Sequence, residues 1–170
     1  MTAQSQVHGC SVAINGIAIL IRGEPASGKS DLLLQLLETT GTGLGDATLQ
    51  TALIADDQTL LTVRGDRLWA GCPATINGLL EVRGQGIIAV PPHGPAPLGL
   101  VIDLLPVEQI ERMPEDDQRT VDLMGFRLPR VFVGSGSVSA ASRVRLAWVR
   151  QSLKNEQHGG LPLLMRQRKQ

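Results

Sequence analysis

Eight consecutive residues, 23–30, carry glycine, lysine and serine at the spacing G-x-x-x-x-G-K-S. In order, they are Gly23, Glu24, Pro25, Ala26, Ser27, Gly28, Lys29 and Ser30. The glycines let a backbone wrap closely around a polyphosphate, with its N–H groups pointing at the phosphate oxygens. The Lys29 ammonium can reach the outer phosphates, and the Ser30 hydroxyl can bind Mg²⁺. This spacing predicts a loop that holds the phosphates of a nucleotide.

Two adjacent carboxylates come later in the chain, at Asp56 and Asp57, directly after the apolar run 52–55. Such a run is typical of a short buried strand. We expect this strand to lie beside the strand that precedes the glycine loop, so that both aspartates face the phosphates. Consecutive side chains of an extended chain point to opposite sides, so one carboxylate can face a metal ion and the other an acceptor hydroxyl. The alternative is a capped turn with a solvated carboxylate.

Four further polar residues are weak candidates when each is taken alone. His8 lies near the N-terminus, Glu81 and Arg83 flank a valine, and Arg112 lies in a charged segment. Solvated or sheet-edge positions explain these side chains equally well.

The elements around the candidate residues predict an α/β fold. Residues 17–21 form an apolar run typical of a buried strand, and residues 31–38 place leucines on one helical face. Strand, glycine loop and helix follow in the order that a phosphate-binding loop requires. Residues 7–14 lead through Asn15-Gly16 into the first of these strands, and Asn-Gly is a strong hairpin signal.

The remaining pattern completes a central mixed sheet flanked by helices, with β-hairpins, in a single domain. We expect a flexible connection at 39–51, a second hairpin at 60–63 and 68–71, strands at 87–90, 98–105 and 128–133 (the last at a sheet edge), a proline-rich loop at 91–97, a polar segment at 106–125 and a helix from about 139 to 153. The domain should occupy 7–153, between a flexible N-terminus at 1–6 and a polar, basic tail at 154–170.

Composition excludes several classes of function. The 16 basic and 16 acidic residues balance, so no net charge attracts nucleic acid or an anionic membrane. Two Trp, two Phe and no Tyr are too few for a base-stacking surface. Cys10 and Cys72 lack metal-ligand spacing and are interpreted as small apolar residues of a reducing compartment. With neither a signal-peptide pattern nor a membrane-length apolar run, we expect a cytoplasmic protein that binds neither nucleic acid nor membrane.

Several segments together resemble the catalytic domain of bacterial HPr kinase/phosphorylase, over about residues 7–150. They are His8-Gly9, the glycine loop, Ala55-Asp56-Asp57 and, most specifically, Glu81-Val82-Arg83-Gly84-Gln85-Gly86, which is similar to that family's signature. The resemblance implies the P-loop fold that this family shares with PEP carboxykinase. It also implies an ATP- and Mg²⁺-dependent protein kinase that phosphorylates a serine of HPr, the phosphocarrier of the sugar phosphotransferase system. Members of the family form homo-oligomers, which are hexamers.

The same resemblance implies a role for each candidate residue. Asp56 matches the base that takes the serine proton, Lys29 the phosphate-binding lysine, and His8 the histidine near that aspartate. Ser30 and Glu81 match the magnesium ligands, and Arg112 matches the arginine of a similar Asp-Arg-Leu stretch. Asp57 and Arg83 are expected to support the site.

Two departures from the family pattern shape the predicted activity. The separate N-terminal domain is expected to be absent, because the His-Gly pair lies almost at the start of the chain. Longer members carry a Pro-x-Arg-x-Gly-Arg-Asn type loop associated with dephosphorylation, whereas residues 133–139 hold neither arginine. Arg143, one helical turn further on, is the only nearby substitute. Without cations to hold incoming phosphate, we expect a kinase with weak or absent phosphorylase activity.

Three alternative functions remain open. The chain can be a nucleotide-sensing module without turnover, a kinase of another protein acceptor, or a small-molecule kinase. The last is disfavoured because no arginine-rich lid segment follows the core.

Overall fold

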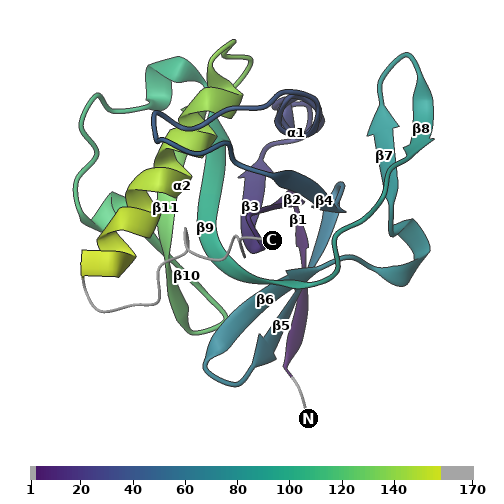
Figure 1. Cartoon of the computed structure of the whole chain (residues 1–170), viewed down its shortest axis with the longest axis horizontal. Coiled ribbons are helices and arrows are strands. Elements are labelled where there is room, and N and C mark those ends of the chain that lie inside the picture. The colour runs from purple at the N-terminus through teal and green to yellow at the C-terminus, as the bar shows by residue number, and fades with distance from the viewer. Residues whose placement is uncertain (1–2, 158–170) are drawn as a thin grey trace.

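The strand that leads into the glycine loop lies inside a curled, nine-stranded mixed sheet (Figure 1). The computed structural model describes residues 3–157. Its strands are β1 (Gln4–His8), β2 (Cys10–Ile14), β3 (Ile17–Gly23), β4 (Thr51–Ala55), β5 (Gln58–Arg64), β6 (Arg67–Gly71), β7 (Leu79–Val82), β8 (Gly86–Ala89), β9 (Ala96–Leu105), β10 (Thr120–Leu123) and β11 (Phe126–Gly134), and its helices are α1 (Lys29–Glu38) and α2 (Ala140–Gln157). Short 3₁₀ turns are η1 (Ala74–Ile76), η2 (Val107–Gln109) and η3 (Asp117–Arg119).

The sheet runs in the order β1-β5-β6-β9-β3-β2-β4, and β11 extends it by pairing with both β9 and β10. β3, β9 and β11 are parallel, so their carboxyl ends meet at one edge of the sheet, where the glycine loop begins. Strands buried on both faces are apolar throughout, and β3 fits this rule from Ala18 to Ile21. The predicted α/β class, with its mixed sheet and hairpins in one domain, is confirmed.

Each face of the sheet has its own core. On one face, Ile19, Ile21 and Ile102 pack in a cluster with Leu33 of α1 and Trp148 of α2. The opposite face forms a second cluster, whose buried members include Leu20, Val101, Leu61 and Leu68. The first cluster fixes α1, and with it the glycine loop, against the sheet.

Most predicted elements form where the pattern placed them. Asn15 and Gly16 both have positive φ, 47° and 81°, as the turn of the β2–β3 hairpin requires. The hairpin of β5 and β6 and the buried strand β9 also form as predicted. α2 continues to Gln157, about one turn beyond the predicted end. The remainder of the predicted tail, 158–170, lies outside the described residues.

The N-terminal segment differs from the prediction in two ways. Residues 4–6, expected to be flexible, belong to β1, which pairs antiparallel with β5. Residues 7–14 were predicted to run into the hairpin as one strand, but the chain breaks at Gly9 into β1 and β2. At this break the backbone packs closely on β3, since a Cβ on Gly9 would lie 2.7 Å from the carbonyl oxygen of Ile21.

The strand that carries the two aspartates is also placed differently. β4 pairs with β2 and not with β3, so β2 lies between the aspartate strand and the strand of the glycine loop. Both pairings are antiparallel, which leaves β4 pointing in the same direction as β3. The aspartates therefore still emerge at the edge where the glycine loop lies.

Two further regions differ in detail from the prediction. The segment 106–125 contains η2, η3 and the strand β10, which pairs with β11. The apolar run at 87–90 forms an exposed strand, β8, that pairs only with β7 in a separate hairpin. That hairpin projects beside α1 (Figure 1). Neither described helix is long and apolar enough to cross a membrane.

Candidate functional site

The glycine loop joins β3 to α1 with the tight backbone that its spacing predicts. A Cβ on Gly23 would lie 2.5 Å from the Ser27 hydroxyl and 3.1 Å from Cβ of Leu104, so a larger residue there would displace its neighbours. Gly28 has a left-handed φ of 90° and is the N-cap of α1. Because the first N–H groups of a helix have no acceptor within the helix, the start of α1 favours an anion. The loop thus has the backbone arrangement of a phosphate-binding site.

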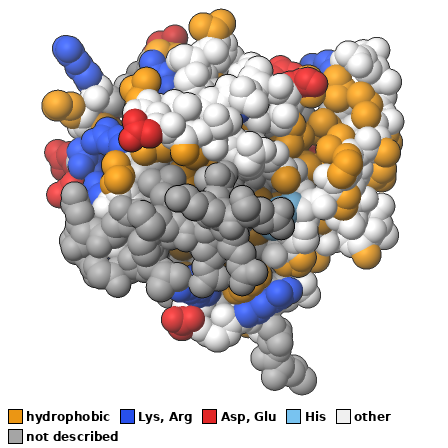
Figure 2. Space-filling model, viewed as in Figure 1, with side chains coloured by type: hydrophobic (Ala, Val, Ile, Leu, Met, Phe, Trp, Pro, Cys, Tyr) orange, Lys and Arg blue, Asp and Glu red, His pale blue; other side chains and the backbone are white. Residues whose placement is uncertain are grey.

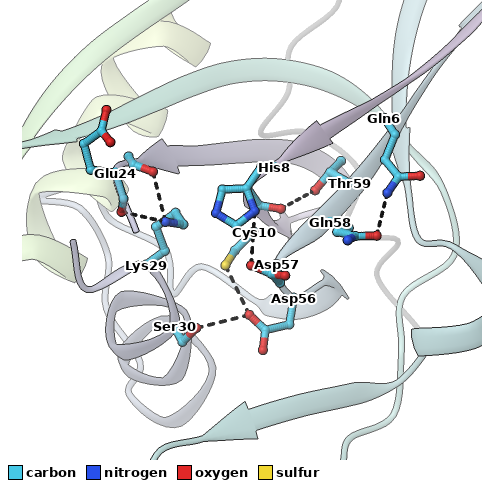
Figure 3. A network of polar contacts seen from close by, with 12 residues as sticks. Gln6, His8, Cys10, Glu24, Lys29, Ser30, Asp56, Asp57, Gln58 and Thr59 are labelled. Carbon is cyan, nitrogen blue, oxygen red and sulfur yellow. Dashed lines mark hydrogen bonds and ion pairs between the residues drawn. The ribbon is translucent and has the colours of Figure 1, made fainter. Parts of the chain in front are cut away.

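Lys29 is largely buried within the turn of this loop. Its ammonium donates hydrogen bonds to the carbonyl oxygens of Gly23, at 3.0 Å, and Glu24, at 2.9 Å (Figure 3). The ammonium is therefore held over the loop, where phosphate oxygens can exchange with the carbonyl oxygens as its partners.

Asp56 is buried, and both of its carboxylate oxygens accept hydrogen bonds. Its Oδ1 accepts hydrogen bonds from the Ser30 hydroxyl, at 3.3 Å, and from the Cys10 thiol, at 3.2 Å. Its Oδ2 accepts a hydrogen bond from the backbone N–H of Glu81, at 3.0 Å. The carboxylate thereby ties α1, β2 and β7 together behind the glycine loop.

Asp57 has the opposite environment. Its φ is 63°, a turn conformation that directs its side chain away from that of Asp56. Its carboxylate lies 3.2 Å from Nδ1 of His8, and the two side chains are 62% and 52% exposed. The backbone N–H of Gly9 donates to the carbonyl oxygen of Asp57, which fixes this turn against the end of β1. His8 and Asp57 therefore form an accessible pair.

A cavity of about 310 Å³ gathers most of the predicted site residues. It is lined by His8, Pro25, Ala26, Gly28, Lys29, Ser30, Asp31, Leu34, Asp57, Glu81, Val82 and Arg83. Asp56 does not line it and lies behind Ser30. The hairpin of β7 and β8 supplies one wall, and the side chains of Glu81 and Arg83 are exposed on it.

The donor set of this cavity fits a magnesium ion bound together with a nucleotide. Among residues 3–157, no group of three or more His, Cys, Asp or Glu side chains is arranged to hold a metal by itself. Mg²⁺ usually binds through one or two protein oxygens, with water and substrate phosphates filling its other positions. The Ser30 hydroxyl and the Glu81 carboxylate, both on the cavity wall, can supply such oxygens.

Two predicted cations lie elsewhere. Arg112 is exposed in the segment between η2 and η3 and does not line the cavity, so its role stays a prediction. Arg143 is exposed on α2, where its Nε donates to the Ser139 hydroxyl at 2.9 Å. The loop after β11 does approach the glycine loop, since the N–H of Gly136 lies 3.9 Å from the position of a Cβ on Gly28.

Cys10 is the part of this site that the sequence did not reveal. Burial is the main reason that the pKa of its thiol rises from 9.0 to about 12, with the nearby Asp56 charge adding to the effect. The thiol is therefore protonated at neutral pH and donates a hydrogen bond. Its apolar neighbours in β2 gave no signal of this role, because cysteine in a buried strand is ordinarily a packing residue.

Comparison with known proteins points to one family. The family model described as HPr Serine kinase C-terminal domain matches residues 1–140. The HPr kinase/phosphorylase of Burkholderia lata is 29% identical over 143 residues, which cover 78% of this chain and 41% of that protein. The HPr kinase/phosphorylase of Clostridium tetani is 35% identical over 91 residues, which cover 54% of this chain and 27% of that protein. The chain thus spans less than half the length of these relatives.

A solved structure agrees in fold. The HPr(Ser) kinase/phosphatase of Coxiella burnetii superposes with a TM-score of 0.72 at 26% sequence identity. The match covers 89% of this chain and 99% of that one. The similarity in fold therefore extends over most of this chain.

Proposed function

Because this chain belongs to the HPr serine kinase C-terminal domain family, we propose that it is a protein kinase that transfers phosphate from Mg-ATP to a serine of HPr. One observation carries the proposal. Lys29 and Ser30, at the start of α1, line the same cavity as the accessible pair of His8 and Asp57. Phosphoryl transfer depends mainly on positioning and on stabilising charge, and it needs groups for the phosphates and a carboxylate for the acceptor hydroxyl.

The glycine loop supports the nucleotide side of this reaction. Its free N–H groups and the Lys29 ammonium would hold the phosphates. Ser30 and Glu81 would hold the magnesium ion, which when bound neutralises charge that develops on the phosphates. Because Asp56 accepts a hydrogen bond from the Ser30 hydroxyl, the oxygen lone pairs of that hydroxyl are free to face a cation.

The geometry favours Asp57 over Asp56 on the acceptor side. The carboxylate of Asp56 is buried with both oxygens engaged, whereas that of Asp57 faces the cavity beside His8. A base must come within hydrogen-bond reach of the proton that it takes. We therefore propose that Asp57 is the base that takes the proton of the acceptor serine, and that Asp56 orients the metal ligand Ser30. The resemblance alone matched the base to Asp56.

The loop at 133–139 supports weak or absent phosphorylase activity. Phosphorolysis needs cations that hold inorganic phosphate beside the phosphoserine. This loop approaches the glycine loop at Gly136 and carries serines in place of the arginines, and Arg143, which follows it on α2, is hydrogen-bonded to Ser139. Transfer in the forward direction does not need those cations.

The test is transfer of labelled phosphate from Mg-ATP to purified HPr, with HPr in which the acceptor serine is alanine as a control. Asp57→Asn should retain ATP affinity and lose at least about 100-fold in transfer. Asp56→Asn should mainly raise the magnesium concentration required. If Asp56→Asn abolishes transfer at saturating magnesium while Asp57→Asn stays active, the two roles are reversed.

The same preparation addresses the other expected properties. Inorganic phosphate added to phosphorylated HPr should release little or no pyrophosphate. Saturable ATP binding without transfer to HPr would instead favour a nucleotide-sensing module or another protein acceptor. Light scattering tests the homo-oligomer that the family implies, and the proposed cytoplasmic location follows from HPr as the substrate.

A further inference from the structure

The buried thiol of Cys10 meets the carboxylate that orients the predicted metal ligand. Cys10 is fully buried at the start of β2, and its Sγ lies 3.2 Å from Oδ1 of Asp56. The Ser30 hydroxyl donates to that same oxygen at 3.3 Å (Figure 3). Two donors from separate elements therefore converge on one carboxylate oxygen.

The backbone that carries the thiol is held firmly. Cys10 is paired with Ile21 in the β2–β3 hairpin, next to the strand that leads into the glycine loop. Its N-terminal neighbour Gly9 accepts a hydrogen bond from the Thr59 hydroxyl, at 2.9 Å, and donates one to Asp57. The sulfur thus has little freedom to move, and its position limits where Oδ1 can lie.

The chemical character of the donor also matters. A lysine or arginine at this position would form an ion pair with Asp56 and reduce the negative charge near a bound cation. A thiol is a weak, neutral donor that can orient a carboxylate without cancelling its charge. An alanine or valine would leave Oδ1 with the Ser30 hydroxyl alone.

We propose that Cys10 is a positioning residue for the metal side of the site: its thiol fixes Oδ1 of Asp56, and Asp56 in turn orients the Ser30 hydroxyl toward the cation of a bound metal–nucleotide. The inference rests on the proposed function only in taking Mg-ATP as the ligand. Groups that orient metal ligands from behind typically change metal affinity by 10- to 100-fold when they are lost.

The first test measures ATP affinity by calorimetry with excess Mg²⁺ and with EDTA, in the absence of any protein acceptor. The dissociation constant in EDTA divided by that in excess Mg²⁺ isolates the contribution of the metal to ATP affinity. Cys10→Ala should reduce this ratio roughly 10-fold without changing the affinity in EDTA. Cys10→Ser keeps a donor of similar size and should restore most of the ratio.

Cys72→Ser is the matched control and should leave the ratio unchanged, because the Cys72 thiol makes no hydrogen bond within the described part of the chain. A ratio in Cys10→Ala equal to that of the unmodified protein overturns the proposal, as does a Cys10→Ser ratio as low as that of Cys10→Ala. No phosphate is transferred in this assay. Failure of the kinase proposal, seen as absent transfer to HPr, is therefore distinguishable from failure of this one.

A second measurement does not depend on the folding of Cys10→Ala. The chain has two cysteines, so in Cys72→Ser the infrared S–H stretch comes from Cys10 alone. Adding Asp56→Asn replaces a charged acceptor with a weaker, neutral one, and the band should move to higher frequency. An unchanged band would show that the thiol does not donate to Asp56, and the proposal would fail.

Discussion

Asp56 and Asp57 are neighbours in the sequence, yet the chain gives them different chemistry. The left-handed φ of Asp57 turns the backbone between β4 and β5, so that one carboxylate enters the interior and the other faces the cavity. The buried carboxylate is tolerated because Ser30, Cys10 and the Glu81 N–H all donate to it. Burial and hydrogen bonding, and not residue type, therefore separate the two proposed roles.

The raised pKa of Cys10 predicts a loss of stability in alkali. Between an unfolded pKa near 9.0 and a folded pKa of about 12, the unfolded thiol releases its proton and the folded thiol keeps it. The unfolded state binds fewer protons in this range, so the free energy of unfolding falls as pH rises. By about pH 10 the contribution of Cys10 to this loss should be about 1.4 kcal/mol.

Urea denaturation at about pH 8 and about pH 10 measures this loss. Cys10→Ser does not titrate there, so its stability should decline less over the same range. The chain has no tyrosine, which removes one common source of alkaline titration from the comparison. Equal declines in the two proteins would contradict a raised pKa.

The sequence predicted individual site residues where their chemistry requires a fixed spacing. The glycine loop was recognisable because two glycines, Lys29 and Ser30 must follow one another at set intervals. The sequence predicted that the two aspartates point apart but not that Asp56 is the buried one, and the role of Cys10 depends on contacts between residues 46 positions apart. No local pattern carries that information.

At the scale of elements, α2 holds α1 in place through a buried arginine. The Nη2 of Arg145 donates to the carbonyl oxygens of Leu36, at 3.2 Å, and Thr39, at 2.5 Å. These carbonyls lie at the C-terminal end of α1. The last carbonyl oxygens of a helix have no N–H donor within the helix, and this end of the helix favours a cation. The helix that begins at Lys29 is thus capped by a residue more than 100 positions later.

Arg145→Met should destabilise the fold by about 2 kcal/mol, because methionine keeps the aliphatic stem but leaves these carbonyls without their charged donor. For a chain of this size the melting temperature should fall by roughly 4–8 °C. Differential scanning calorimetry checks this value. Arg150→Met, at an exposed position of the same helix, is the control and should change it little. Equal losses in both variants would exclude a specific capping role.

Element positions were easier to predict from the sequence than their partners. Apolar runs located β3, β4 and β9, since buried strands need them. The same criterion assigned 87–90 to a strand but could not show that β8 would be exposed and paired with β7 alone. Likewise, nothing local indicates that β2 separates β4 from β3, because strand order is set by contacts between distant segments.

At the scale of the whole molecule, one edge of the curled sheet collects the site. The carboxyl ends of β3 and β4, the end of β1 and the wall of the β7–β8 hairpin all meet around the start of α1. On the face drawn in Figure 2, apolar side chains gather at the right of the view, over the β7–β8 hairpin. Because strands from both ends of the sheet lead to the cavity, a ligand bound there contacts segments from across the whole domain.

That arrangement predicts that Mg-ATP stabilises the entire domain. A ligand that binds only the folded state at about 100 times its dissociation constant contributes about 2.7 kcal/mol. In a chain of this length the melting temperature should then rise by roughly 5–11 °C. Lys29→Ala removes the ammonium that would hold the phosphates and should abolish most of this rise. Arg67→Ala changes an exposed cation in the β5–β6 turn, far from the glycine loop, and should leave the rise intact. A rise that persists in Lys29→Ala would mean that ATP binds elsewhere on the molecule.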